Sequence, residues 1–579
     1  MMMGKTKKIS ITRKNTLFML GGLTLYWLLF LHIGWKNSGG WGSDLPYNLL
    51  GWGFILSLCT LFWFFFSDNL IANIGVTGKY IVIGAALMTL PMLWSPTFAT
   101  FINALPRLMG MWGGLLFWGT LRQCRFSSRQ RMWLIYCLAG AGIIEAAIVL
   151  IELYAHPAWL PAIWQTIVAQ FGRYATGVFQ QINLTASFLA TGLAALLLLI
   201  GLRAARLENA THEKWRMVLL AVGCVLITAV LTFASSRTGW LAGLAVVACL
   251  YYLLNFSLFR HQGHQQPLLL ALPLIGTLVG LALMPYSAHQ ALLMHQGSNH
   301  QRLLTLYYTF LYAIQHPILG YGAGTYEGEY QHYLAMLPGG NPGLETMSHP
   351  HNELLYQYAE GGFIALAGAL VWLGLVARVW RKADSALYRG IVICMLPIML
   401  HTQLEYPLYY SVPHYLALLM LLSLAEKDEP QAVENTSRAS TPVFRYTMLL
   451  LTFYGALVSL QSYRVWQTLE RFEASSLAEP EVITALNVPG VVRLRYEQDL
   501  TLLRLFRFRH EKDLGSLREF TEENAIWMSV HAWPVLYQNQ ISVLRYLNDE
   551  KNVALWQEQA LRTFPWDKRF QINTVPTMH

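Results

Sequence analysis

Two histidines, an asparagine and a glutamate stand together immediately before a long apolar run of the chain. They are His349, His351, Asn352 and Glu353, in the sequence T-M-S-H-P-H-N-E-L-L-Y-Q-Y-A-E-G-G-F-I-A over residues 346–365. A neutral histidine that titrates near ~6.5 can take a proton from a hydroxyl group at neutral pH. We interpret this stretch as a candidate site for general base catalysis. The alternative is a solvated helix start whose side chains only bond to the backbone.

A metal site is a poor explanation for the same residues. Two histidines at positions i and i+2 do not share a helical face, and no third ligand follows at a zinc-binding spacing. The cysteines lie inside predicted spans or cytoplasmic loops and form no C-x-x-C pair: Cys59, Cys124, Cys137, Cys224, Cys249 and Cys394. The sequence therefore predicts neither a metal ion nor a structural disulfide.

Three arginines are predicted on the same side of the membrane as the histidines. Arg173 stands in F-G-R-Y-A-T-G-V-F-Q-Q-I-N, Arg237 in S-S-R-T-G-W and Arg302 in Q-R-L-L-T-L-Y-Y. A guanidinium is always charged and its planar fork of donors fits phosphate oxygens. Together the three arginines predict a pyrophosphate site. The alternative is that each one reaches a lipid headgroup or a loop carbonyl.

Glu405, in L-E-Y-P-L-Y-Y, is predicted at the outer end of a span, where it would orient the base or a cationic neighbour. A solvated helix end is the alternative. Gly320, Gly322 and Gly324 have the spacing of a nucleotide loop, but no strand precedes them. We interpret these glycines as a bent loop that lets backbone approach the site.

The elements that must carry these residues are membrane spans. The 579-residue chain is 55% hydrophobic and only 13% charged, which is too apolar for a soluble protein. Apolar runs long enough to cross about 30 Å of hydrocarbon recur along it. We predict an all-α polytopic membrane protein with about 13 spans, at approximately these positions: 16–35, 47–67, 80–95, 104–121, 132–153, 184–202, 217–234, 240–258, 267–285, 352–377, 390–404, 411–425 and 446–464.

Lysine and arginine clusters fall on one side of these spans if the N-terminus is cytoplasmic. The net charge of +9 is spread over short loops and gives no indication of nucleic acid binding. We predict a transmembrane domain over 1–465 with a large periplasmic loop at 286–351, and a periplasmic helical domain, built of stacked hairpins, over 466–579. The polar stretch 426–445 is predicted to be a flexible cytoplasmic linker.

The four polar motifs, in this order, resemble the O-antigen ligase and O-oligosaccharyltransferase superfamily of bacterial inner-membrane proteins. The most specific part is His351-Asn352, nine further residues, and then G-F-I-A from Gly362 to Ala365. Ala365 stands where the family has glycine. The S-R-T-G turn at Arg237 and the stretch G-V-F-Q-Q-I-N also resemble family motifs. The tail from about residue 469 resembles that of enzymes that glycosylate pilins and other exported proteins.

The resemblance implies a GT-C-like fold and glycan transfer from an undecaprenyl-diphosphate carrier at the periplasmic face. No metal, nucleotide sugar or other cofactor is implied, and the partners would be the lipid-linked glycan, membrane lipid and a pilin-like acceptor. It assigns His351 as the base, with His349 beside it able to exchange that role. Arg237, Arg302 and, more weakly, Arg173 would bind the diphosphate. We name five supporting residues: Asn352, Glu353, Gln180, Asn183 and Glu405.

Three other functions remain open at this point. A lipid A-core ligase or an O-antigen polymerase would use the same residues on a different acceptor. A polysaccharide transporter or flippase fits the number of spans, but transporters place ionisable residues near the bilayer midplane, not at one outer face. The C-terminal domain could also be a docking module for a partner enzyme.

Overall fold

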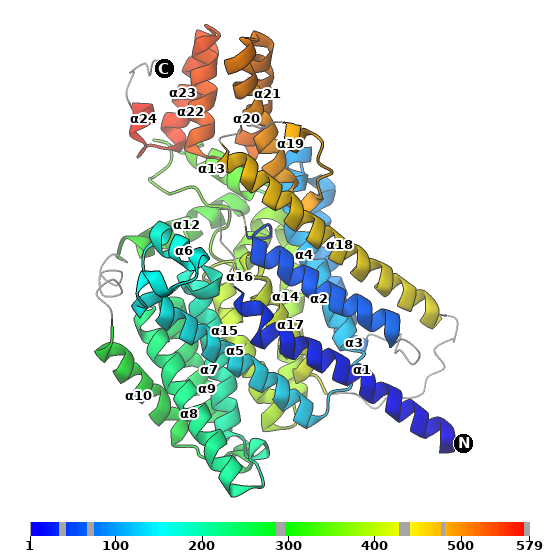
Figure 1. Ribbon diagram of the computed structural model, residues 1–579. Helices are drawn as coiled ribbons and strands as arrows, with labels where there is room; N and C mark the ends of the chain where they lie inside the picture. The colour runs from blue at the N-terminus through cyan, green and yellow to red at the C-terminus, as the bar shows by residue number, and fades with distance from the viewer. Residues whose placement is uncertain are drawn as a thin grey trace. The chain divides into compact units, whose positions relative to one another are not determined.

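The protein is described by a computed structural model over residues 2–33, 42–66, 75–284, 296–427, 440–475 and 481–571 (Figure 1). Within these residues the chain is helical, and its β-structure is limited to an isolated bridge between Leu202 and Gly263. The α-helices are α1 Met2–Leu28, α2 Pro46–Phe65, α3 Gly75–Thr89, α4 Phe98–Leu121, α5 Ser128–Tyr154, α6 Ala162–Phe171, α7 Ile182–Gly201, α8 Ala210–Phe233, α9 Arg237–Asn255, α10 Leu268–Ala282, α12 Gln296–Ala313, α13 Tyr326–Met336, α14 Glu353–Lys382, α15 Ala386–Thr402, α16 Pro407–Tyr410, α17 Val412–Ala425, α18 Ser440–Ala474, α19 Glu481–Thr484, α20 Arg493–Glu511, α21 Leu514–Val530, α22 Pro534–Tyr546, α23 Glu550–Thr563 and α24 Lys568–Gln571. Short 3-10 turns occupy Phe30–His32, Leu90–Trp94, Pro157–Trp159, Gly177–Phe179, Arg203–Ala205, Arg260–Gln262 and Gly490–Val492.

Nine helices in the described part of the chain are long and apolar enough to cross a membrane, so the predicted all-α polytopic class is confirmed. Three further predicted spans correspond to the shorter apolar helices α10, α15 and α17. At 1.5 Å per residue, the 15 residues of α10 extend about 22 Å, less than the hydrocarbon thickness. The remaining one, 104–121, belongs to α4, which carries Pro106 and Arg107.

The chain divides into two compact units, each described here by itself. Unit 1 comprises residues 1–82, 110–295 and 372–460, and unit 2 comprises residues 83–109, 296–371 and 461–579. In unit 2 the tail groups with residues 83–109 and 296–371, and the domain division at residue 465 stays a prediction. Several predicted segments lie partly outside the described residues: the linker at 428–439, the loop at 286–295, the tail at 476–480 and 572–579, and span ends at 34–35, 67 and 285.

Helix α7 forms the centre of unit 1. Its apolar window is wholly buried, and it packs against α5, α8, α9 and α15. Small residues allow the closest crossing: a Cβ on Gly142 of α5 would lie 3.0 Å from the Cα of Gly192 of α7. Close approach of this kind provides the packing that holds helices together in lipid. Because α7 is fixed on all sides, the polar residues at its N-terminus are held in place.

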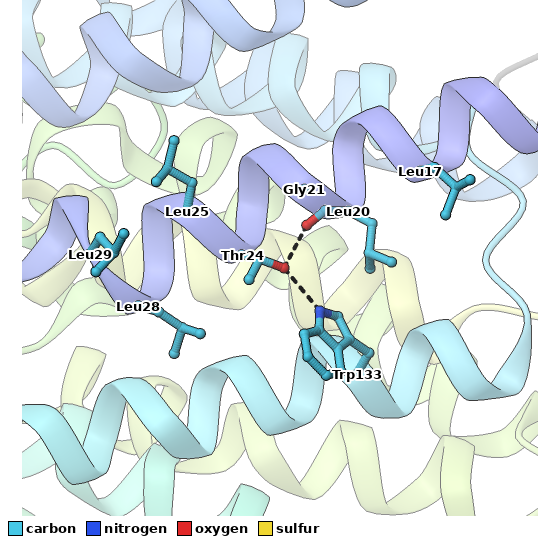
Figure 2. A pocket seen from close by; sticks show the side chains of 8 residues that line it. All are labelled: Leu17, Leu20, Gly21, Thr24, Leu25, Leu28, Leu29 and Trp133. Atoms are coloured by element: carbon cyan, nitrogen blue, oxygen red, sulfur yellow. Dashed lines mark hydrogen bonds between the residues drawn. The ribbon is translucent and has the colours of Figure 1, made fainter.

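An apolar groove lies along α1 and is closed on one side by Trp133 of α5 (Figure 2). It has a volume of about 610 Å³. Its Thr24 hydroxyl donates to the Leu20 carbonyl over 2.7 Å and accepts from Trp133 Nε1 over 2.9 Å (Figure 2). The rest of the lining is leucine with Gly21. The groove therefore presents hydrocarbon and suits a lipid chain, not a sugar or a phosphate.

Unit 2 combines a broken helix with a helical tail. Helix α14 has a non-helical residue inside it, Gly362, at φ 57° and ψ −152°. The glycine loop, defined by Gly320, Gly322 and Gly324, precedes α13 and packs on this break. The N–H of Tyr321 donates to the Ala359 carbonyl over 3.1 Å, and the N–H of Phe363 donates to the Pro317 carbonyl over 2.8 Å. The expected bent loop is present, and its backbone does approach α14.

The tail is built of antiparallel helical hairpins, α20 with α21 and α22 with α23, and both hairpins pack on α13. The tail is therefore helical, as predicted. A buried pair joins it to α13, with His531 Nδ1 lying 3.0 Å from Glu327 Oε2. Nearer the histidines, the Thr346 hydroxyl donates to the Ala532 carbonyl over 3.0 Å.

Candidate functional site

The predicted site residues occur in both units and form one polar cluster in each. Unit 2 contains the histidine cluster, defined as His349, His351, Asn352 and Glu353, together with Arg302. Unit 1 contains the glutamate cluster, defined as Gln180, Gln181, Asn183, Ser236 and Glu405, together with Arg173 and Arg237. We describe each cluster separately.

His349 is the buried histidine of the pair, with 3% of its surface exposed. Its Nδ1 accepts the backbone N–H of His351 over 3.0 Å, so the ring proton lies on Nε2. This Nε2 faces Glu353 Oε2 at 3.4 Å. Burial lowers the pKa of His349, with Glu353 acting in the opposite direction, so the ring is kept neutral near pH 7.

His351 is half-buried and has a left-handed backbone, with φ at 58°. A residue with a side chain pays about 1–2 kcal/mol in this region, so neighbouring contacts must hold it there. The N–H bond to His349 is such a contact. His349 therefore helps to fix the backbone of the loop at His351.

The two residues after His351 start α14. Asn352 Oδ1 accepts the N–H of Leu355 over 3.0 Å, which caps the helix. Glu353 also accepts from the side-chain amide of Gln357 over 2.9 Å. Asn352 thus makes the cap of α14, while Glu353 faces His349.

A buried ion pair beneath the histidines was missed at the sequence level. Arg107 Nη2 of α4 lies 2.5 Å from Glu360 Oε2 of α14, and its guanidinium is 4.7 Å from the centre of the Tyr356 ring. The Tyr356 ring is in turn 4.4 Å from the His349 ring. The available signal was a single cation in the predicted span 104–121 and a carboxylate inside the predicted span 352–377, because such residues usually pair.

Glu360 also holds the glycine loop. Its Oε1 accepts the N–H of Gly324 over 3.0 Å and that of Tyr326 over 3.3 Å. Gly320 has φ at 67°, and a Cβ there would lie 2.5 Å from the carbonyl carbon of Glu360. The loop can therefore dock on α14 only with glycine at this position. Arg302 lies half-buried on α12 of the same unit.

In unit 1, Arg173 bonds to the C-terminal end of α5. Its guanidinium donates to the carbonyls of Leu153 at 2.9 Å and Ala155 at 2.8 Å. These are carbonyls that a helix end leaves unsatisfied. The contact is the loop-carbonyl role named above as the alternative for Arg173, and diphosphate binding by this residue stays a prediction.

Two glutamates of α5 that sequence reasoning missed hold the segment between Arg173 and α7. Glu152 accepts the N–H of Gly177 over 2.9 Å, and Glu145 accepts the N–H of Val178 over 3.0 Å. Glu145 and Glu152 are seven residues apart and so share one face of α5. That spacing, inside a predicted span, was the signal for their role.

Glu405 accepts hydrogen bonds from the start of α7. Its Oε1 accepts from Asn183 Nδ2 over 2.6 Å, and Asn183 Oδ1 accepts from the Ser236 hydroxyl over 2.7 Å. Glu405 is buried, so the solvated helix end is excluded. Gln180 lies half-buried just before α7, in the left-handed region with φ at 53°. Arg237, half-buried, is the first residue of α9, directly after Ser236.

Together the fold and the two clusters define an integral membrane protein with a histidine loop at the start of a span. Among the described residues, no group of three or more His, Cys, Asp and Glu side chains could hold a metal ion. Residues 222–370 match the family described as O-antigen ligase. Residues 391–578 match the family described as virulence factor membrane-bound polymerase, C-terminal. The two matches support the O-antigen ligase and polymerase superfamily, which suggests a glycosyltransferase activity.

The first match includes Arg237, Arg302 and both histidines, and the second includes Glu405 and the helical tail. Arg173, Gln180 and Asn183 lie outside both matches. A search of curated proteins found no match.

Proposed function

We propose that this protein transfers a glycan from an undecaprenyl-diphosphate carrier to serine or threonine hydroxyls of exported, pilin-like proteins. The reaction would take place at the periplasmic face of the bacterial inner membrane. The observation that carries the chemistry is the pair of histidines, in which a buried neutral His349 holds the half-buried His351 in a left-handed turn. A base held in this way is oriented before the substrate arrives.

The proposed step is a direct displacement. The acceptor oxygen attacks the anomeric carbon, the bond from that carbon to the diphosphate oxygen breaks, and the hydroxyl proton passes to a ring nitrogen of His351. Arg237 and Arg302 would stabilise the charge that develops on the leaving diphosphate. A single displacement inverts the anomeric centre. The lipid chain of the donor would remain in the hydrocarbon region.

A protein acceptor is supported by the contacts between the tail and the histidine-bearing segment. Besides the Thr346 bond to Ala532, Asn341 Nδ2 donates to the Thr563 carbonyl over 2.9 Å. Arg562 Nε donates to the Ala335 carbonyl over 2.8 Å. A helical domain joined in this way to the loop that precedes His349 is suited to present a folded acceptor to it.

The second candidate is glycan polymerisation or ligation to lipid A-core. It is favoured by the description of the family that matches residues 391–578, a membrane-bound polymerase. The donor and the chemistry would be unchanged, and the acceptor would be a sugar hydroxyl.

Intact-mass spectrometry tests the proposal. A pilin-like protein is co-expressed with this chain and a lipid-linked glycan pathway, and lipopolysaccharide is examined in the same cells. We expect a glycan-sized mass increase with the wild type, and a loss of about 10²–10⁴ in rate for His351→Ala. His332→Ala is the matched control, because His332 is an exposed histidine on α13. Altered lipopolysaccharide with unmodified proteins would favour the second candidate, and wild-type turnover in His351→Ala would exclude the base role.

A further inference from the structure

A continuous chain of buried hydrogen bonds crosses unit 1 from the start of α17 to the start of α9. Its side chains come from α7, the cap of α9, the end of α15 and the start of α17, and all but one are less than 9% exposed. Asn183 is the exception and is half-buried. In spatial order the chain is Ser411, His414, Ser187, His401, Glu405, Asn183 and Ser236.

The histidine half of the chain is tightly spaced. His414 Nε2 lies 3.0 Å from the Ser187 hydroxyl, which lies 2.8 Å from His401 Nδ1. His401 Nε2 then lies 3.1 Å from Glu405 Oε2. His401 and His414 are both fully buried. Nothing in the proposed displacement uses either histidine, so their presence in an apolar helix bundle needs another reason.

The direction of each bond follows from which atoms can only accept. Both oxygens of Glu405 accept amide protons, one from Asn183 and one from Gln181 at 3.2 Å, so the carboxyl group is the acceptor for His401 as well. His401 therefore carries its proton on Nε2, and its Nδ1 accepts from the Ser187 hydroxyl. His414 Nε2 lies 3.1 Å from the Leu184 carbonyl, which can only accept, so His414 also carries its ring proton on Nε2.

The other half of the chain ends at Ser236, the residue directly before Arg237. Asn183 Oδ1 accepts a hydrogen bond from the Ser236 hydroxyl. Ser236 Oγ accepts the N–H of Gly239 over 3.1 Å, and this bond caps α9. Ser235, before the cap, is left-handed with φ at 58°. The next residue after the cap is Arg237. Glu405 is thus linked, through Asn183 at the start of α7, to Ser236, the cap residue that sets where α9 begins. Arg237 is the first residue of α9.

We propose that His401 is a positioning residue for Arg237, and hence for the diphosphate of the donor. With Ser187 and His414 behind it, His401 fixes the Glu405 carboxyl group. That group holds Asn183, and Asn183 holds the Ser236 cap. This inference rests on the proposed function, because it needs Arg237 to bind the donor. It assigns the histidines of α15 and α17 to donor binding and leaves the base role with His351.

The test is a steady-state transfer assay on purified full-length protein, with donor and acceptor concentrations varied separately. We expect His401→Leu to lower kcat/KM for the donor about 10–100-fold, because a small misplacement of a binding group has effects up to about 10²-fold. The KM for the acceptor should be unchanged. His401→Gln keeps an N–H donor toward Glu405 and should recover most of the loss. Thr191→Val is the matched control: among the residues that the structure describes, this buried hydroxyl on α7 bonds only to the Ser187 carbonyl of its own helix.

A double-mutant cycle shows whether His401 acts through Arg237. If it does, the variant with both His401→Leu and Arg237→Ala is no slower than Arg237→Ala alone, within about twofold. If the losses in kcat/KM caused by His401→Leu and by Arg237→Ala multiply in the double variant, the inference is overturned. So would a loss in His401→Leu confined to the amount of folded protein, with KM for the donor unchanged.

His351→Ala measured alongside separates the two proposals. If it stops transfer while His401→Leu is like wild type, only the positioning role fails. If His351→Ala turns over like wild type, the proposed chemistry fails and this inference fails with it.

Discussion

The backbone N–H of His351 donates to Nδ1 of His349 over 3.0 Å, so one histidine of the motif holds the other in a left-handed conformation. The interaction uses the acceptor nitrogen of His349 and directs its N–H toward Glu353. Both ring nitrogens of His349 therefore face partners within the histidine cluster. The two histidines therefore differ in burial and in hydrogen bonding, and the first prediction follows from this difference.

Replacing His349 should weaken catalysis according to whether an acceptor is kept. In His349→Asn, the amide oxygen stands near the place of Nδ1 and can accept the His351 N–H. We expect this variant to retain far more transfer activity than His349→Leu, which leaves that N–H unpaired and the left-handed turn unsupported. Rates measured at equal amounts of folded protein check this. Equal rates in the two variants would contradict the holding role.

Gly320 should tolerate no side chain, whereas Gly339, which also has a positive φ, should tolerate one. Gly320→Ala places a Cβ 2.5 Å from the backbone of Glu360, so the glycine loop must leave α14. Gly339 also has a positive φ, 92°, but has no atom within 4 Å of a Cβ. Gly339→Ala should cost only about 1–2 kcal/mol of backbone strain. Thermal unfolding midpoints and transfer rates of both variants compare the two costs. Similar effects would show that backbone approach is unimportant.

The Arg107 and Glu360 pair should be a strong determinant of stability in unit 2. Glu360→Ala leaves a buried guanidinium and two backbone N–H groups without their acceptor, which should cost about 3–5 kcal/mol. Glu360→Gln keeps an acceptor oxygen and should cost less. The double variant Arg107→Met with Glu360→Gln removes the buried charges and should recover part of the loss. Unfolding in detergent measures all three. A double variant worse than Glu360→Ala would contradict the charge argument.

The sequence predicted which motifs are polar and where spans begin, since both depend on local patterns. The start of α14 at Glu353 and the bent glycine loop both follow from neighbouring residues. The predicted number of spans was larger than the number of long helices because apolar composition does not report helix length. The 14 residues of α17 are as apolar as a span but shorter than one.

Pairings between distant segments could not be predicted from local pattern. Glu360 finds Arg107 more than 250 residues away, and His401 finds Ser187 more than 200 residues away. Arg173 illustrates the same point, because a guanidinium that suits a diphosphate also suits the carbonyls at the end of α5, and only the structure shows the second contact. Charge identifies the candidates, and only the packing of helices decides which partner each one meets.

Asp499 in the helical tail should make stability fall as pH rises. It is buried on α20 near Glu473, whose carboxylate accepts two bonds from Arg495, each 2.6 Å long. Burial first, and then the charge of Glu473, raises the pKa of Asp499 from 3.8 to about 7. A carboxyl whose pKa is raised by folding binds more protons in the folded state. The free energy of unfolding therefore decreases between pH 3.8 and about 7, and changes no further above it.

Asp499→Asn removes that titration, so its unfolding midpoint should rise relative to wild type through this pH range and stay constant above about pH 8. Asp513 provides the control. It is exposed at the start of α21, and hydrogen bonds from the Gly515 and Ser516 N–H groups lower its pKa from 3.8. Its contribution is lost only in acid, so Asp513→Asn should differ from wild type by the same amount at pH 5 and pH 8. Thermal unfolding at four pH values between 5 and 8 compares both variants. A difference for Asp499→Asn that is flat, or that shrinks as pH rises, would show that Asp499 is already ionised in the folded tail.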